Sequence, residues 1–147
     1  MRNRKELRLN QIEVNITVPN QTKYLCMIGK IGESLAHTLN NYHGDREELA
    51  YHLNLVLTEA LSNAICHANA CDPTKEVRVS ISASDKNLKI CVFDQGKGFD
   101  IQHLAKMKVN ETAEGGRGIQ IIFKLMDRVE YLRKGSGNVL EMTKRLH

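Results

Sequence analysis

The segment that most constrains the fold is a pair of adjacent strands, 76–84 (EVRVSISAS) and 88–94 (LKICVFD). Only residues 85–87 separate the two strands, which predicts a tight hairpin. A second pair of strands, 129–134 and 139–146, flanks a Gly-Ser-Gly-Asn turn near the C-terminus. The chain is therefore expected to build a sheet in which most neighbouring strands run antiparallel.

Two long segments ahead of the first hairpin have the spacing of amphipathic helices. Apolar side chains recur every three or four residues over 21–40 and again from Arg46 to about Asn69. Asp45 is a predicted N-cap for the second helix, and Glu48 three residues later completes a pattern similar to a capping box. A third and largely buried helix is predicted over 117–127.

The order of these elements predicts the fold class. Residues 7–18 alternate apolar and polar side chains and predict one more strand. Together the elements predict an α/β two-layer sandwich, with helices on one face of a mixed, mainly antiparallel sheet. A chain of 147 residues without repeats or linkers is expected to form a single domain, residues 1–147. A short helix near 101–106 and a mobile loop over 106–114 are expected to connect the two hairpins.

Composition and charge exclude several classes of protein. Hydrophobic residues make up 41% and charged residues 26% of the chain, which is ordinary for a globular protein. The net charge of +4 suits an anionic ligand, and without a dense Lys/Arg run we expect no direct nucleic-acid partner. No apolar run is long enough to span a membrane, and the charged N-terminus lacks a signal core. The four cysteines lack C-x-x-C spacing, so we expect buried or half-buried free thiols in the cytoplasm.

Three polar side chains lie four residues apart on the second predicted helix: Glu59, Asn63 and His67. Each step of four drifts only about 40° around a helix, so the three share one stripe. One explanation is a polar face that meets solvent. The other is a site in which Asn63 gives an amide oxygen to Mg²⁺ and Glu59 orients or deprotonates an attacking hydroxyl. His67 is expected to pack or cap rather than to take part.

A second cluster follows the strand 88–94, which ends in Asp94 with Gly96 and Gly98 just beyond it. A carboxylate at a strand end can accept a hydrogen bond from an exocyclic amine such as that of adenine. Glycines let the backbone turn sharply and let a flat ring approach closely. Ordinary turns also use Asp and Gly, so this stretch taken alone is better explained as a turn.

A third cluster of glycines opens the helix predicted over 117–127, at Gly115, Gly116 and Gly118. Backbone N–H groups at a helix start attract phosphate oxygens, and Arg117 adds a fork of donors. The alternative is a plain flexible loop before a helix. The succession of all three clusters along one chain favours a nucleotide site.

These clusters resemble the N, G1 and G2 boxes of the GHKL ATPase superfamily, in the patterns Glu59-x-x-x-Asn63, Asp94-x-Gly96-x-Gly98 and Gly115-Gly-Arg-Gly118, the last with Leu125-Met-Asp-Arg-Val-Glu-Tyr131 downstream. More narrowly, the chain is similar to the small anti-sigma-factor serine/threonine kinases of bacteria, over nearly its whole length. The resemblance implies a Bergerat ATP-binding fold that uses ATP and Mg²⁺.

The resemblance also implies roles for individual residues. Asn63 would bind Mg²⁺, and Glu59 would be the general base. Asp94 would bind the adenine amine, with Gly96 and Gly98 lining the base pocket. The phosphates would lie against the glycine-rich segment behind a lid of about residues 101–115, with contacts from Gly115, Gly116, Arg117 and Gly118.

The expected partners also follow from the resemblance. Members of that family phosphorylate an anti-sigma-factor antagonist and bind a sigma factor, and relatives often form a homodimer. The first hypothesis is therefore a protein kinase with these two partners. The second is a nucleotide-dependent binding switch with little phosphotransfer. A histidine-kinase catalytic domain is a third idea, disfavoured because we expect no dimerisation helices ahead of the first strand.

Overall fold

The computed structural model describes most of the chain. Of residues 116–117 it describes the backbone alone. The described residues are 11–39, 42–98, 100–102 and 116–146. Everything below concerns these residues.

One sheet of five strands, in the order β1-β2-β3-β5-β4, forms the back of the molecule. The strands are β1 (Ile12–Pro19), β2 (Glu76–Ala83), β3 (Asn87–Asp94), β4 (Arg128–Lys134) and β5 (Gly137–Arg145). Every neighbouring pair of these described strands is antiparallel. The predicted two-layer α/β fold is thus confirmed, and the described sheet contains no parallel pair.

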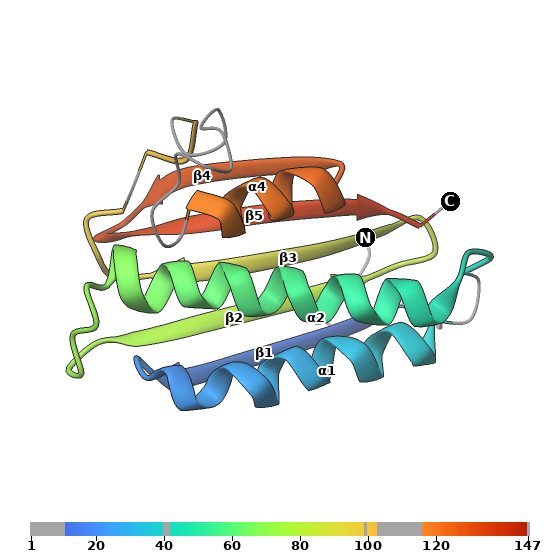
Figure 1. Ribbon diagram of the computed structural model, residues 1–147, viewed down its shortest axis with the longest axis horizontal. Helices are drawn as coiled ribbons and strands as arrows, with labels where there is room; N and C mark the ends of the chain where they lie inside the picture. Colours follow the sequence, from blue (N-terminus) through green and yellow to red (C-terminus); the bar gives the residue numbers. More distant parts are fainter. Residues whose placement is uncertain (1–10, 40–41, 99, 103–115, 147) are drawn as a thin grey trace, which may run out of the picture.

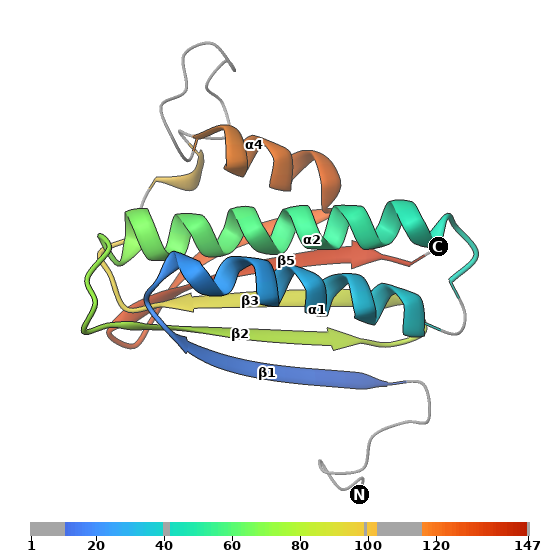
Figure 2. The same ribbon diagram turned by 60° about the horizontal axis from the view of Figure 1, so that its bottom comes forward.

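The helices all cover the same face of this sheet (Figure 1 and Figure 2). They are the 3₁₀ turn η1 (Thr22–Tyr24), α1 (Leu25–Thr38), α2 (Arg46–Asn63), the π-helical turn η2 (Ala64–Ala68) and α4 (Gly116–Leu125). Helix α2 lies between α1 and α4 and packs against both. In Figure 1 the end of α2, the end of β3 and the start of α4 all lie at the left end of the molecule.

Buried and exposed side chains alternate along the strands because one face of the sheet is covered by the helices. On β2 the inward side chains are at most 1% exposed, and they are Val77, Val79, Ile81 and Ala83. Since successive side chains on a strand point to opposite faces, a slip of one residue would expose this whole set. The core therefore fixes the register that places the ends of the strands.

Helix α2 forms the centre of the core. The four leucines expected on its buried face are each at most 1% exposed, namely Leu49, Leu53, Leu57 and Leu61. The neighbouring helix α1 approaches closely because it carries glycine where α2 presents side chains: a Cβ on Gly29 would lie 2.6 Å from Asn54 Oδ1. This tight packing gives α2 a rigid base for the polar residues at its C-terminal end.

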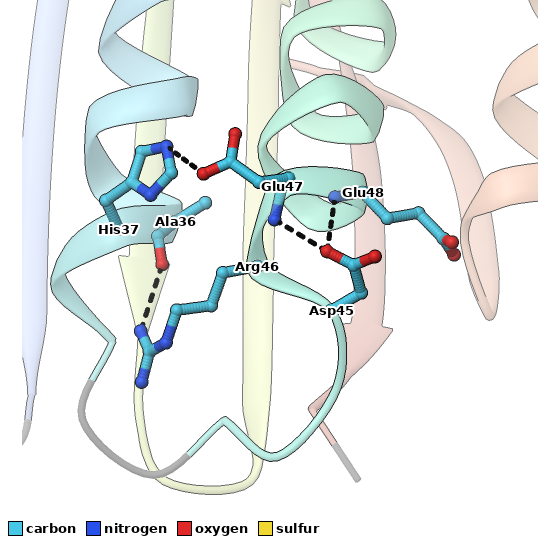
Figure 3. Close-up of polar contacts among 6 residues, drawn as sticks. All are labelled: Ala36, His37, Asp45, Arg46, Glu47 and Glu48. Atoms are coloured by element: carbon cyan, nitrogen blue, oxygen red, sulfur yellow. Dashed lines mark hydrogen bonds and ion pairs between the residues drawn. The ribbon is translucent and has the colours of Figure 1, made fainter.

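Asp45 caps the N-terminus of α2, as the sequence predicted (Figure 3). Its Oδ1 accepts hydrogen bonds from the backbone N–H groups of Glu47, at 3.0 Å, and Glu48, at 3.2 Å. The carboxylate of Glu48 points away from Asp45 in Figure 3, so the predicted pair is a one-sided cap. His37 and Glu47 also form a polar contact between α1 and α2, with 3.6 Å from Nε2 to Oε1.

Loss of this cap is expected to weaken the fold measurably. Asp45→Ala should lower the free energy of unfolding by about 1 kcal/mol, because two N–H groups at the helix start lose their acceptor. The measurement is urea unfolding followed by circular dichroism. Asp45→Asn keeps a side-chain oxygen and should lose less than half as much. Equal losses for the two variants would show that the cap is not the source of the effect.

Several boundaries differ from the sequence prediction by one or two residues. Asn87 pairs with Arg145 and so belongs to β3 rather than to the turn before it. Gly137 and Asn138 belong to β5, because β4 and β5 remain paired up to Lys134 and Gly137. These shifts matter for the site, since they place Asn138 directly opposite Asp94 in the β3–β5 pair.

The second predicted helix does not stay α-helical to Asn69. It becomes π-helical after Asn63, and the turn ends where Asn69 N donates to Ala64 O at 2.8 Å. Ala70 and Cys71 then adopt left-handed backbone conformations, with φ of 52° and 57°. π-helical turns are rare in proteins, and those that are found often lie at functional sites.

Some expectations fall partly or wholly outside the described residues. Of the short helix predicted near 101–106, Ile101 and Gln102 are described, and both are helical. The loop predicted over 106–114 lies outside the described part of the chain. Within the described part, none of the helices combines the length and apolarity needed to cross a membrane. The cysteines are free, but the expectation of burial is wrong for two of them, since Cys26 and Cys71 are exposed.

Candidate active site

Asp94 lies at the end of β3 on the helix-covered face, and it is only 5% exposed. Its Oδ1 accepts hydrogen bonds from Gly96 N at 3.0 Å and from Asn138 Nδ2 at 2.9 Å. Its Oδ2 accepts one from the hydroxyl of Tyr131 at 2.7 Å. Three donors from three segments therefore hold the carboxylate in one orientation.

The donor on Oδ2 stays protonated. Burial raises the pKa of the Tyr131 hydroxyl, and the hydrogen bond to Asp94 and the charge of Asp94 raise this pKa further. The Tyr131 hydroxyl is thus a fixed donor at physiological pH.

Gly96 lies directly against the π turn at the end of the second helix. A Cβ on Gly96 would overlap the carbonyl oxygen of Ala68, so any side chain here would force the loop and the turn apart. The contact holds the loop after Asp94 against the segment that follows Asn63. The sequence pattern of two glycines thus reflects a close backbone approach at Gly96.

Gly96→Ala is accordingly expected to cost about 3 kcal/mol or more of unfolding free energy, because backbone atoms cannot rotate away as a side chain can. Thermal and urea unfolding would measure the loss. Gly135→Ala is a matched control: nothing lies within 4 Å of its Cβ, and only its φ of 59° is unfavourable. The control should lose about 1 kcal/mol. Similar losses in both variants would refute the close approach at Gly96.

Gly98 covers the donors that hold Asp94. Its φ is +83°, which favours glycine. A Cβ at this position would lie 3.0 Å from both the Tyr131 hydroxyl and Asn138 Nδ2. Asp94, Gly96 and Gly98 are therefore brought together around one carboxylate, as the sequence pattern suggested.

Asn63 lies at the last position of α2 and is only 2% exposed. The structure thus rules out the explanation of Asn63 as a solvent-facing residue. Its Nδ2 is buried and has no hydrogen-bond partner among the described residues. A buried donor left unpaired costs about 1–3 kcal/mol, so this NH₂ group calls for an acceptor, such as an oxygen of a bound ligand or a water.

Glu59 lies one turn before Asn63 and is half-buried. A Cβ on Gly118 would overlap its Oε2, so the carboxylate lies against the first turn of α4. The packing of α2 on α4 therefore brings the predicted base next to the helix start that the sequence singled out. His67 is exposed on the π turn, whereas Asn63 is buried, so the structure separates these two.

A magnesium ion fits these residues. Among the described residues no group of three or more His, Cys, Asp or Glu side chains could form a metal cage. Mg²⁺ commonly takes few protein ligands and keeps water and phosphate oxygens, so the amide oxygen of Asn63 alone is a suitable protein ligand. Gly116 and Arg117 begin α4. Gly115 and the Arg117 side chain lie outside the described structure, so their roles stay predictions.

A family model described as a histidine kinase-like ATPase domain matches residues 28–144, which include both ends of this site. The chain belongs to the histidine kinase-like ATPase family. This membership confirms the superfamily that the three motifs resembled, and with it a nucleotide-binding domain.

Individual relatives agree with this assignment. The chain is 30% identical to a serine-protein kinase RsbW of Bacillus licheniformis over 142 residues, which are 91% of this chain and 86% of that protein. It is 33% identical to an anti-sigma F factor of Pasteuria penetrans over 100 residues, 64% of this chain and 67% of that protein. Within its family, the chain is therefore similar to serine-protein kinases and to an anti-sigma factor.

A solved structure shows the same fold. It is the histidine kinase domain of a blue-light activated histidine kinase from Erythrobacter litoralis, with a TM-score of 0.52 and 22% identity. The match covers 88% of this chain and 62% of that one, so the chain spans less than two thirds of that structure.

A buried amide network ties the two ends of this candidate site together, and sequence reasoning missed it. Asn69 is fully buried, and its Oδ1 accepts a hydrogen bond from Gln95 N, the residue after Asp94, at 2.8 Å. Its Nδ2 donates to Asn20 Oδ1 at 3.0 Å. Asn20 Nδ2 in turn donates to Asp72 O at 3.0 Å. The segment after Asn63 and the loop after Asp94 are therefore held in one arrangement.

Proposed function

We propose that the chain is an ATP-dependent serine/threonine protein kinase that phosphorylates an anti-sigma-factor antagonist and binds a sigma factor. The observation that carries the proposal is the burial of the Asn63 side chain, one helical turn from the carboxylate of Glu59. The names of the relatives, serine-protein kinase and anti-sigma F factor, support the same activity and partners.

The base of ATP would bind at the Asp94 end. The three donors on Asp94 keep it in place as an acceptor for the adenine amine. Gly96 and Gly98 would line the base pocket, because their missing side chains leave the backbone close to the carboxylate. This assignment makes the stretch after β3 part of a ligand site rather than an ordinary turn.

The phosphates would bind between the ends of α2 and α4. Asn63 would hold Mg²⁺ through its amide oxygen, and the bound ion would neutralise charge on the phosphate oxygens. The backbone N–H groups at the start of α4 would attract these anions, as at other helix N-termini. Gly115, Gly116, Arg117 and Gly118 would supply these contacts.

Glu59 would act on the phosphate acceptor. Its carboxylate lies against Gly118, where the phosphates would approach, so it can orient a serine or threonine hydroxyl and take its proton. Phosphoryl transfer needs mainly positioning and charge stabilisation, which this arrangement supplies without a covalent intermediate.

The similarity to an anti-sigma F factor also favours a second candidate, a nucleotide-dependent binding switch with little phosphotransfer. Incubation of the purified protein with Mg²⁺, γ-labelled ATP and candidate antagonist proteins separates the two. The kinase proposal expects label on a serine or threonine of the antagonist. Tight ATP binding without a labelled product would favour the switch, and no ATP binding would refute both.

The proposal also covers the location of the protein, its partners and its assembly. We expect it in the cytoplasm, with a sigma factor and an antagonist as its protein partners and a homodimer as its assembly. Affinity purification from the native host should recover a sigma factor or an antagonist. Recovery of neither would count against the proposed partners.

A further inference from the structure

We infer that Tyr131 is a positioning residue for Asp94 and thereby makes the site selective for a purine with an amino group at position 6. The inference rests on the proposed binding of the base at Asp94. Tyr131 lies on β4, at the edge of the sheet, and reaches Asp94 across β5. It ends the stretch Leu125-Met-Asp-Arg-Val-Glu-Tyr131 downstream of the third motif, and the sequence pattern assigned it no role.

The carboxylate of Asp94 offers a limited number of acceptor positions. An ionised carboxylate has about four lone pairs, two on each oxygen. Gly96 N and Asn138 Nδ2 use those of Oδ1, and the Tyr131 hydroxyl uses one of Oδ2. Among the described residues this leaves one acceptor position, on Oδ2. A ligand that offers one N–H donor fits it.

The hydroxyl of Tyr131 decides where that last position points. Its 2.7 Å hydrogen bond occupies one side of Oδ2, so the remaining lone pair faces the other side. Asn138 Nδ2 also donates to Gly96 O at 3.1 Å, which ties the Oδ1 side to the loop. Tyr131 thus acts on the oxygen that would meet the base, and Asn138 acts on the other one.

This arrangement discriminates against other bases. A purine with oxygen at position 6 would place an acceptor against Oδ2, and the Tyr131 hydroxyl already donates its proton to that oxygen, so it cannot bridge the two acceptors. A purine without any group at position 6 would leave the last lone pair unpaired. The 6-amino group alone satisfies the oxygen that Tyr131 orients.

Calorimetric titration of wild type and Tyr131→Phe with two magnesium nucleotides tests the inference. The nucleotides are ATP and purine riboside triphosphate, which has hydrogen in place of the 6-amino group. Wild type should bind ATP about tenfold more tightly than the analogue. Tyr131→Phe should reduce this ratio to about threefold or less, because the acceptor on Oδ2 is no longer oriented. Tyr51→Phe removes a hydroxyl from an exposed side chain and should leave the ratio unchanged.

The ratio separates positioning from a purely structural role. A structural role would weaken both nucleotides equally, and an unchanged ratio in Tyr131→Phe would overturn the inference. Tyr131→Val also lacks the hydroxyl and suits a half-buried strand position, so it provides a second test if the first variant does not fold. Failure of wild type to bind ATP, or equal binding of both nucleotides, would instead refute the proposed base site itself.

Discussion

Glu59→Gln is expected to slow phosphoryl transfer to the antagonist by about 10²- to 10⁴-fold while ATP affinity stays within about threefold. Glutamine has nearly the same shape, so it can keep the contact with Gly118, but it cannot accept the proton of the attacking hydroxyl. Initial rates of antagonist phosphorylation measure the first quantity, and calorimetric titration with Mg-ATP measures the second.

Glu48→Gln is the matched control for this variant. Glu48 is an exposed carboxylate on the same helix, and its side chain points away from the cap. Its replacement should leave both the rate and the affinity unchanged. A normal rate of phosphoryl transfer by Glu59→Gln would refute the assignment of Glu59 as the general base. A collapse of ATP affinity in this variant would place Glu59 among the binding residues instead.

Asp94→Asn is expected to weaken ATP binding by about tenfold to a hundredfold. The asparagine has one acceptor oxygen instead of two, so its NH₂ group must face either the Tyr131 hydroxyl or the donors from Gly96 and Asn138. Losing a charged acceptor and creating this donor conflict should together cost about 1.4–2.8 kcal/mol of binding free energy. Calorimetric titration at a temperature where the variant is folded provides the affinity.

The control for this second variant is Asp85→Asn. Asp85 is exposed in the turn between β2 and β3, at the opposite end of β3 from Asp94. Its replacement should leave ATP affinity unchanged. Unchanged affinity in Asp94→Asn itself would return this stretch to the ordinary turn that it resembles when taken alone.

Much of the fold could be predicted because short-range patterns determine it. The alternation in β2 and β3 and the spacing of Leu49 and Leu53 on α2 follow directly from which face is buried. The pairing of Glu59 and Asn63 was also predictable, because both lie on one regular helix. The burial of Asn63 was not, since the same spacing fits a solvent-facing stripe.

The remaining features depend on contacts between distant segments. Tyr131 lies 37 residues from Asp94 in the chain, and Asn138 lies 44 residues away. Asn69 and Asn20 are 49 residues apart. Only the strand order β3-β5-β4 and the π turn after Asn63 bring such groups together, and no local pattern specifies either. A motif in one segment therefore does not predict which polar residues of another strand contact it.

The central claim is that Asn63, Glu59 and Asp94 serve one ATP site. A crystal structure of the protein with Mg²⁺ and a non-hydrolysable ATP analogue tests it most directly. The account predicts the 6-amino group on Asp94 Oδ2, the metal on the side-chain oxygen of Asn63 and the terminal phosphate facing Glu59. A nucleotide bound elsewhere, or a site that stays empty at saturating nucleotide, would contradict it.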